Sequence, residues 1–199
     1  MKYNGKNTHD YGDTMGKIIY ITGGARSGKS SFAEQLAIKL NQKIAYIATS
    51  IPFDDEMRKR VKLHRERRPA NWLTIEAYTD LDEQIDKVIS EVDAFLLDCI
   101  TVMTTNIMMD NIADFNSISD DESQSFEDQV NTQLDKLLAY CRNFDKTIII
   151  VSNEVGMGIV PLYKSARLFR DVAGRANQKI AESADEVYLC VSGIPVKIK

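Results

Sequence analysis

The chain has 199 residues, with 25 Lys and Arg against 29 Asp and Glu, so its formal net charge is -4 at pH 7. That length suffices for one domain with a large buried core, and the negative charge with interspersed signs disfavours a protein that binds nucleic acid polymers. Cys99, Cys141 and Cys190 are far apart and lie in apolar runs, which favours reduced packing residues over a disulfide framework or a zinc site. We therefore expect a cytoplasmic protein, without a membrane segment because no run of about 20 apolar residues is present.

A polar stretch opens the chain. Residues 1–15 are expected to form a flexible extension, and residues 16–199 a single α/β domain. Five β-rich runs follow in chain order, separated by helical patterns: residues 17–22, 43–49, 94–98, 146–152 and 186–192. Continuous apolar strands that alternate with helices predict a mostly parallel sheet with helices on both faces.

Two of the helical stretches carry apolar residues at every fourth position, which predicts stripes that face the core. The stripes are Phe32, Leu36 and Leu40 in the first stretch, and Leu134 and Leu138 in a later one. Residues 111–124 are acidic and rich in Ser and Asn, so they predict an exposed or disordered loop before a helix of residues 125–143.

The segment between the first strand run and the first helical stretch fits the P-loop pattern G-x-x-x-x-G-K-[ST]. It consists of Gly23, Gly24, Ala25, Arg26, Ser27, Gly28, Lys29 and Ser30. The glycines let backbone N–H groups point at an anion, and the following helix adds the positive end of its dipole. Lys29 would reach the β- and γ-phosphates of a nucleotide, and the Ser30 hydroxyl would bind Mg²⁺. A glycine-rich turn without a ligand is the alternative, but the strand–loop–helix context favours nucleotide binding.

A second acidic group is expected near the Mg²⁺ of a P-loop protein. Asp98 ends the apolar run 94–98, which is the usual place for that acid. A solvated strand end is the alternative reading of Asp98 alone. In combination with the P-loop, the position favours Asp98 and Ser30 as the metal-binding pair.

Residues 54–68 begin with acids and end with bases, and Pro69 follows them, which predicts a helix that complements its own dipole. One face of that helix carries Glu56, Arg60, His64 and Arg68. A solvated, salt-bridged helix is the alternative interpretation. Arg65, Arg67 and Arg68 around the histidine instead favour contact with phosphate oxygens, because guanidinium groups match their geometry.

With these motifs and several later ones, the chain resembles the bifunctional adenosylcobinamide kinase/adenosylcobinamide-phosphate guanylyltransferase family of cobalamin biosynthesis. The matching segments are TGGARSGKS (22–30), YIATS (46–50), DDEMRKRVKLHRERRPANW (54–72), LLDCIT (96–101), SNEVGMGIVP (152–161) and FRDVAGRANQKIAESADEVYLCVSGIPVKIK (169–199). The resemblance implies a RecA-like P-loop fold and a homotrimer. It also implies an enzyme that phosphorylates the aminopropanol hydroxyl of cobinamide with ATP or GTP, and then joins GMP from GTP to that phosphate.

The resemblance further implies roles for individual residues. His64 would carry the GMP as a covalent guanylyl-histidine. The nucleotide would be held by the P-loop and by Thr49, Ser50, Ile51, Arg65, Glu66, Arg67, Arg68, Glu76 and Asp98. Some relatives have glutamate in place of Asp98, which keeps the charge but changes its reach and leaves direct and water-mediated metal contact open.

Asn153, Glu154, Gly156 and Gly158 follow the fourth strand run, where α/β sheets place ligand-binding loops. The glycines would let a bulky substrate approach the backbone, so we expect these residues to bind the corrinoid. A flexible connection between strand and helix is the alternative.

Three hypotheses compete at this point. The first is the bifunctional kinase and guanylyltransferase, which requires His64. The second is an ordinary P-loop small-molecule kinase, for which His64 would be incidental. The third is a P-loop switch or motor that binds partners or DNA, against which the negative charge and the lack of a basic stripe speak.

Overall fold

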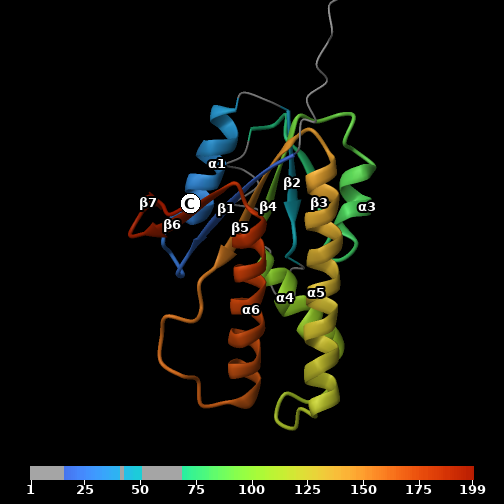
Figure 1. Cartoon of the computed structure of the whole chain (residues 1–199), viewed down its shortest axis with the longest axis vertical. Helices are drawn as coiled ribbons and strands as arrows, with labels where there is room; N and C mark the ends of the chain where they lie inside the picture. Colours follow the sequence, from blue (N-terminus) through green and yellow to red (C-terminus); the bar gives the residue numbers. More distant parts are fainter. Residues whose placement is uncertain (1–15, 41–42, 51–68) are drawn as a thin grey trace, which may run out of the picture.

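A seven-stranded sheet forms the centre of the computed structural model, which describes residues 16–40, 43–50 and 69–199. The strands are β1 (Lys17–Gly23), β2 (Ile44–Ala48), β3 (Leu73–Glu76), β4 (Ala94–Asp98), β5 (Thr147–Asn153), β6 (Glu186–Val191) and β7 (Ile194–Lys197). Their order in the sheet is β3-β2-β4-β5-β1-β6-β7, and every neighbouring pair is parallel except β6 and β7 (Figure 1). The mostly parallel P-loop α/β fold that the sequence predicts is confirmed.

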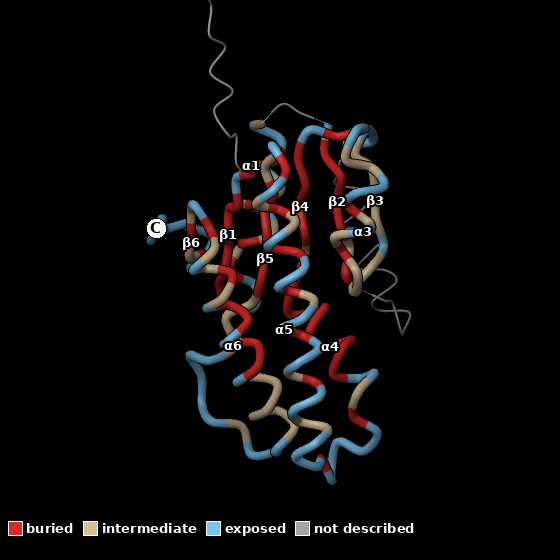
Figure 2. Tube along the Cα trace, turned by 45° about the vertical axis from the view of Figure 1, so that its right-hand side comes forward, coloured by how far each residue is buried: buried red, intermediate tan, exposed pale blue. Residues whose placement is uncertain are grey.

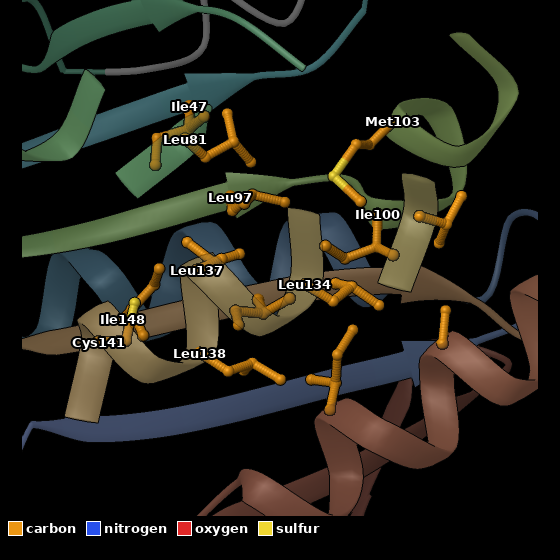
Figure 3. Close-up of a cluster of buried hydrophobic side chains, with 14 of the residues drawn as sticks. Ile47, Leu81, Leu97, Ile100, Met103, Leu134, Leu137, Leu138, Cys141 and Ile148 are labelled. Carbon is orange, nitrogen blue, oxygen red and sulfur yellow. The ribbon is translucent and has the colours of Figure 1, made fainter. Parts of the chain in front are cut away.

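Helices cover both faces of the sheet. They are α1 (Lys29–Lys39), α3 (Leu81–Asp86), α4 (Ile100–Asn111), α5 (Asp120–Asn143) and α6 (Lys164–Ser183). On one face, Ala33 and Ala37 of α1 pack against Ile19 and Ile21. The other four helices contribute to the larger core cluster on the opposite face, part of which is shown in Figure 3.

Successive residues of β1 alternate between these two core clusters. Ile18 and Tyr20 belong to the larger cluster, whereas Ile19 and Ile21 belong to the cluster under α1. Because both faces are covered, both sets must be apolar, and the strand reads as a continuous apolar run. Figure 2 shows the result as buried strands at the centre of the molecule.

Residues 120–124 depart from the predicted loop, because α5 begins at Asp120. Ser119 and Glu122 form a capping box in which the Ser119 Oγ accepts from the Glu122 N–H at 3.1 Å, and the Glu122 carboxylate accepts from the Ser119 N–H at 2.9 Å. The acidic residues that looked like loop composition lie in the first helical turn, where they interact favourably with the helix dipole. The predicted loop is therefore wrong for these five residues and for Asn111, the last residue of α4.

The sequence runs predicted neither β3 nor β7, the two outer strands. Each has only four residues, and β7 is exposed throughout and contains Pro195. Such short segments carry no pattern of a buried strand, and proline is tolerated only because β7 lies at the sheet edge. The turn between β6 and β7 has positive φ at both Ser192 (51°) and Gly193 (85°), as two-residue hairpins prefer.

The carboxyl ends of the parallel strands share one edge of the sheet. Figure 1 shows α5 and α6 extending beyond that edge, together with the segment that joins β5 to α6. Among the described residues, no helix has the length and apolar character that a membrane crossing requires. The three cysteines are buried and form no disulfide, in agreement with their predicted packing role.

Candidate active site

The P-loop joins the carboxyl end of β1 to the amino end of α1, as its sequence predicts. Gly28 is the N-cap residue of α1 and has a φ of 89°, a left-handed conformation that glycine adopts without a steric penalty. No side chain caps this helix, so its first N–H groups and its positive dipole end remain available to an anion.

Lys29 is the first residue of α1, and only 8% of it is exposed. Its Nζ donates to the Gly24 carbonyl oxygen at 3.2 Å, which folds the side chain over its own loop. Within the described ranges, no carboxylate forms an ion pair with this ammonium group. A buried charge without a counter-ion is costly, so the loop is suited to a bound phosphate.

Asp98 ends β4 at the same edge of the sheet. The register pairs Asp98 with Val151 of β5, and it pairs Gly23 with Asn153 of the same strand. Asp98 is half-buried, and its Oδ2 accepts from the Tyr46 hydroxyl at 3.2 Å. One strand thus separates the Asp98 carboxylate from the P-loop strand.

The donor set at this edge fits Mg²⁺ in the manner of nucleotide-dependent enzymes. The Ser30 hydroxyl and the Asp98 carboxylate offer hard oxygen ligands, and Mg²⁺ commonly takes its other ligands from substrate phosphates and water. In the part of the chain that the structure describes, no group of three or more His, Cys, Asp or Glu residues forms a separate metal site.

Thr49 follows β2 and lies almost completely buried, with 1% exposure. Its Oγ1 donates to the Cys99 carbonyl at 2.8 Å and accepts from the Cys99 N–H at 3.0 Å, while its own carbonyl accepts from Asn106 Nδ2 at 2.7 Å. These bonds tie the end of β2 to the start of α4. Thr49 thus shapes the edge on which Ser50 and Asp98 lie, a role in addition to the nucleotide contact that the family resemblance implies.

The segment that follows β5 is held by hydrogen bonds to α4, α6 and β1. The Asn153 N–H donates to Thr101 Oγ1 at 2.6 Å, and Asn177 Nδ2 donates to the Asn153 carbonyl at 3.0 Å. The Glu154 N–H then donates to the carbonyl of Gly23 at 3.0 Å. Sequence reasoning missed Thr101 and Asn177, because only their α4 and α6 helices bring them to this strand end.

The β6–β7 turn closes the other side of the P-loop. The Gly193 N–H donates to the Ser27 carbonyl at 2.9 Å. A Cβ atom on Gly28 would lie 2.9 Å from the Gly193 Cα, so the two backbones approach too closely for a side chain. The glycine of the P-loop motif therefore serves this contact as well as the turn itself.

Burial disfavours the thiolate form of all three cysteines. Burial, followed by the negative charge of Asp98, raises the pKa of Cys99 to about 11. Burial likewise raises the pKa of Cys141 and of Cys190. Buried thiols of this kind are poorly suited to act as nucleophiles.

Known proteins resemble this chain over nearly its whole length. Residues 19–198 match the family model described as cobinamide kinase / cobinamide phosphate guanyltransferase. The chain belongs to this family. The bifunctional adenosylcobalamin biosynthesis proteins CobU of Escherichia coli (strain K12) and Salmonella typhimurium are each 46% identical over 182 residues, which cover 92% of this chain and 99% of each relative. The bifunctional protein CobP of Pseudomonas aeruginosa is 36% identical over 179 residues, covering 90% of this chain and 95% of CobP.

Membership of the cobinamide kinase / cobinamide phosphate guanyltransferase family agrees with the resemblance drawn from the motifs. The structure brings the P-loop, Asp98, Asn153 and Glu154 to one edge of the sheet. Glu76 is exposed at the end of β3, further along the same edge, and Gly156 and Gly158 are exposed beyond β5. The remaining expected site residues lie outside the described residues: Ile51, His64, Arg65, Glu66, Arg67 and Arg68.

Proposed function

We propose that this chain phosphorylates the aminopropanol hydroxyl of cobinamide with ATP or GTP, and then transfers GMP from GTP to the new phosphate with release of pyrophosphate. The observation that carries the proposal is the buried Lys29 in a P-loop, found in a chain 46% identical to bifunctional relatives over 92% of its length. An ordinary small-molecule kinase would explain the P-loop but not the likeness to bifunctional proteins along the whole domain.

The P-loop serves the phosphoryl transfer. Backbone N–H groups at the start of α1 and the Lys29 ammonium would hold the β- and γ-phosphates, while Ser30 and Asp98 would hold Mg²⁺. When bound, Mg²⁺ offsets the negative charge of the phosphates. Little covalent work falls to the protein in this step, so position and charge supply most of the rate.

The guanylyl transfer requires a nucleophile, for which we propose His64. A neutral imidazole nitrogen attacks the α-phosphorus of GTP, pyrophosphate leaves, and the phosphoramidate then passes GMP to cobinamide phosphate. Arg65, Arg67 and Arg68 would bind the phosphate oxygens beside it. The raised pKa of Cys99, the cysteine next to Asp98, supports a nucleophile other than a thiol.

The segment after β5 is our candidate for corrinoid contact. The segment begins with Asn153 and Glu154, and the Glu154 backbone contacts the P-loop. It continues through Gly156 and Gly158, and its apolar side chains Met157 and Ile159 are 79% and 95% exposed. This arrangement suits cobinamide, because its hydroxyl must reach the nucleotide phosphates while its large corrin ring stays outside the site. A Cβ on Gly158 meets nothing within 4 Å, so the backbone there is open to approach.

The test of the two-step reaction is to incubate the protein with GTP labelled at the α-phosphorus and to denature it. We expect the label to remain on the wild-type chain, to be lost in mild acid as a phosphoramidate is, and to be absent from His64→Ala. This variant should still phosphorylate cobinamide, because only the guanylyl transfer needs the nucleophile. An acid-stable label, or a label that persists in His64→Ala, places the nucleophile elsewhere. No label on the wild-type chain favours the ordinary kinase.

A further inference from the structure

Glu154 follows β5 next to the P-loop, in a position that suits a chemical role as well as substrate contact. Three acidic residues lie at the carboxyl ends of strands: Glu76 ends β3, Asp98 ends β4 and Glu154 follows β5. Of these three strands, only β5 pairs with the P-loop strand β1. Glu154 follows Asn153, which lies opposite Gly23 in the register, and the Glu154 N–H donates to the Gly23 carbonyl at 3.0 Å.

The backbone at Glu154 is held from several sides. Thr101 of α4 and Asn177 of α6 bind the two backbone groups of the preceding residue at 2.6 Å and 3.0 Å. The buried Ser152 Oγ lies 3.1 Å from the same Thr101 hydroxyl. A carboxylate on such a support has its position set by the sheet and by two helices rather than by a mobile loop.

Glu154 is half-buried as a residue, and one of its carboxylate oxygens accepts a hydrogen bond. Oε1 accepts from the Gly156 N–H at 2.6 Å, which fixes the side chain over the start of the exposed segment. From the residues that the structure describes, Oε2 accepts no hydrogen bond and Glu154 forms no ion pair. One carboxylate oxygen is thus available to an incoming group, on a residue whose backbone is hydrogen-bonded to the first residue of the P-loop.

We infer that Glu154 is the general base of the phosphoryl transfer. The inference rests on the proposed function and assigns a chemical role to a residue that the sequence marks only for substrate binding. Glu154 Oε2 takes the proton of the acceptor hydroxyl as that oxygen bonds to the γ-phosphorus. The bond between the γ-phosphorus and the β–γ bridging oxygen breaks, and the nucleoside diphosphate leaves with the electron pair. Glu154 then returns the proton to water.

Asp98 is less suited to this role. It lies one strand further from β1, and its Oδ2 already accepts from the Tyr46 hydroxyl. It remains the metal-facing acid of our proposal. Two carboxylates on neighbouring strands would then have separate roles: Asp98 near the metal and Glu154 near the acceptor hydroxyl.

The experiment compares Glu154→Gln with the wild type and with Glu91→Gln, an exposed residue just before β4 at the opposite edge of the sheet. Glutamine keeps an oxygen that accepts from the Gly156 N–H, so the segment retains its turn, but the amide cannot take a proton at neutral pH. We expect kcat for cobinamide phosphorylation to fall about 10²–10⁴-fold. Nucleotide affinity and the Mg²⁺ requirement should stay within twofold, and Glu91→Gln should match the wild type.

The pH profile supplies a readout that a merely structural role would not change. Wild-type kcat should fall on the acidic side as the carboxylate is protonated, and Glu154→Gln should lack that limb. A kinase rate within threefold of the wild type overturns the inference, as does an equal loss of nucleotide affinity or a raised Mg²⁺ requirement. A wild-type chain that does not phosphorylate cobinamide overturns the proposed function and the inference with it.

Discussion

Lys29 shows how a single residue can serve binding at the expense of stability. The ammonium is buried with a backbone carbonyl as its partner, an arrangement that favours an anion and disfavours the empty site. We expect Lys29→Met to weaken nucleotide binding about 10–100-fold, the value of one hydrogen bond to a charged group, and to lower both activities. The free energy of unfolding should stay equal or rise.

Calorimetric titration with nucleotide and urea unfolding measure the two effects separately. Lys39→Ala is the control, because Lys39 is an exposed lysine in the last turn of the same helix. Nucleotide affinity within twofold of the wild type in Lys29→Met would mean that the P-loop does not hold the phosphates.

The P-loop depends on an element that comes at the end of the chain, the β6–β7 hairpin. Gly28→Ala would place a Cβ 2.9 Å from the Gly193 Cα and would force alanine into a φ of 89°. We expect weaker nucleotide binding and a loss of more than about 1–2 kcal/mol in the free energy of unfolding, because the left-handed conformation alone costs that much and the close approach to Gly193 adds to it. Urea unfolding and nucleotide titration measure both.

Gly174→Ala is the matched control for that substitution. It lies within α6, and its Cβ would meet nothing within 4 Å. Alanine should therefore stabilise the helix by about 0.5–1 kcal/mol. A loss in Gly28→Ala no larger than about 1–2 kcal/mol, the cost of the left-handed conformation, would show that contact with the hairpin does not constrain the P-loop.

Glu186 joins three strands by its charge. The hydrogen-bonded ion pair with Lys17 of β1, the Tyr188 hydroxyl and Lys197 of β7 lower the pKa of Glu186 from 4.5 to about 2. A folded-state pKa below the unfolded value adds stability above pH 4.5, and that stability is lost as the pH falls from 4.5 towards 2.

We expect Glu186→Gln to lower the free energy of unfolding by about 1–2 kcal/mol at pH 7, since both lysines are about half exposed and solvent screens the pairs. The difference from the wild type should vanish near pH 2. Urea unfolding between pH 7 and pH 2.5 checks this, and a difference that stays constant over the range would contradict it.

At the scale of the whole molecule, the chain presents an exposed apolar segment between β5 and α6. Met157, Ile159, Val160, Leu162 and Tyr163 are between 63% and 95% exposed. Contiguous apolar surface of this kind marks a contact site. The segment is our candidate for corrinoid contact, so we expect the double variant Ile159→Ser/Leu162→Ser to raise the KM for cobinamide. Since the family resemblance implies a homotrimer, we expect the wild-type chain and this variant both to sediment as trimers.

Ile38→Ser is the control for sedimentation, because Ile38 is a 52% exposed apolar residue on α1, away from that segment. A double variant that dissociates while the KM for cobinamide stays unchanged would assign the segment to the subunit contact instead of the corrinoid.

The local features of this protein follow from its sequence alone. The P-loop is a short segment whose glycines and flanking strand and helix determine its conformation, so Gly23 to Ser30 were recognisable without coordinates. The five strands β1, β2, β4, β5 and β6 were equally visible, because burial on both faces makes them continuous apolar runs. The start of α5 was missed because acidic and serine residues read as loop, although Ser119 and Glu122 form a capping box.

Only the tertiary structure decided what surrounds the phosphate site. The strand order β4-β5-β1 brings Glu154 beside Gly23, and the hairpin turn at Gly193 meets Ser27 from far along the chain. Thr101, Asn106 and Asn177 support strand ends through hydrogen bonds that span between 24 and 57 residues. Such contacts leave no periodic signal, because they result from how two covered faces and parallel pairing arrange elements that are distant in sequence.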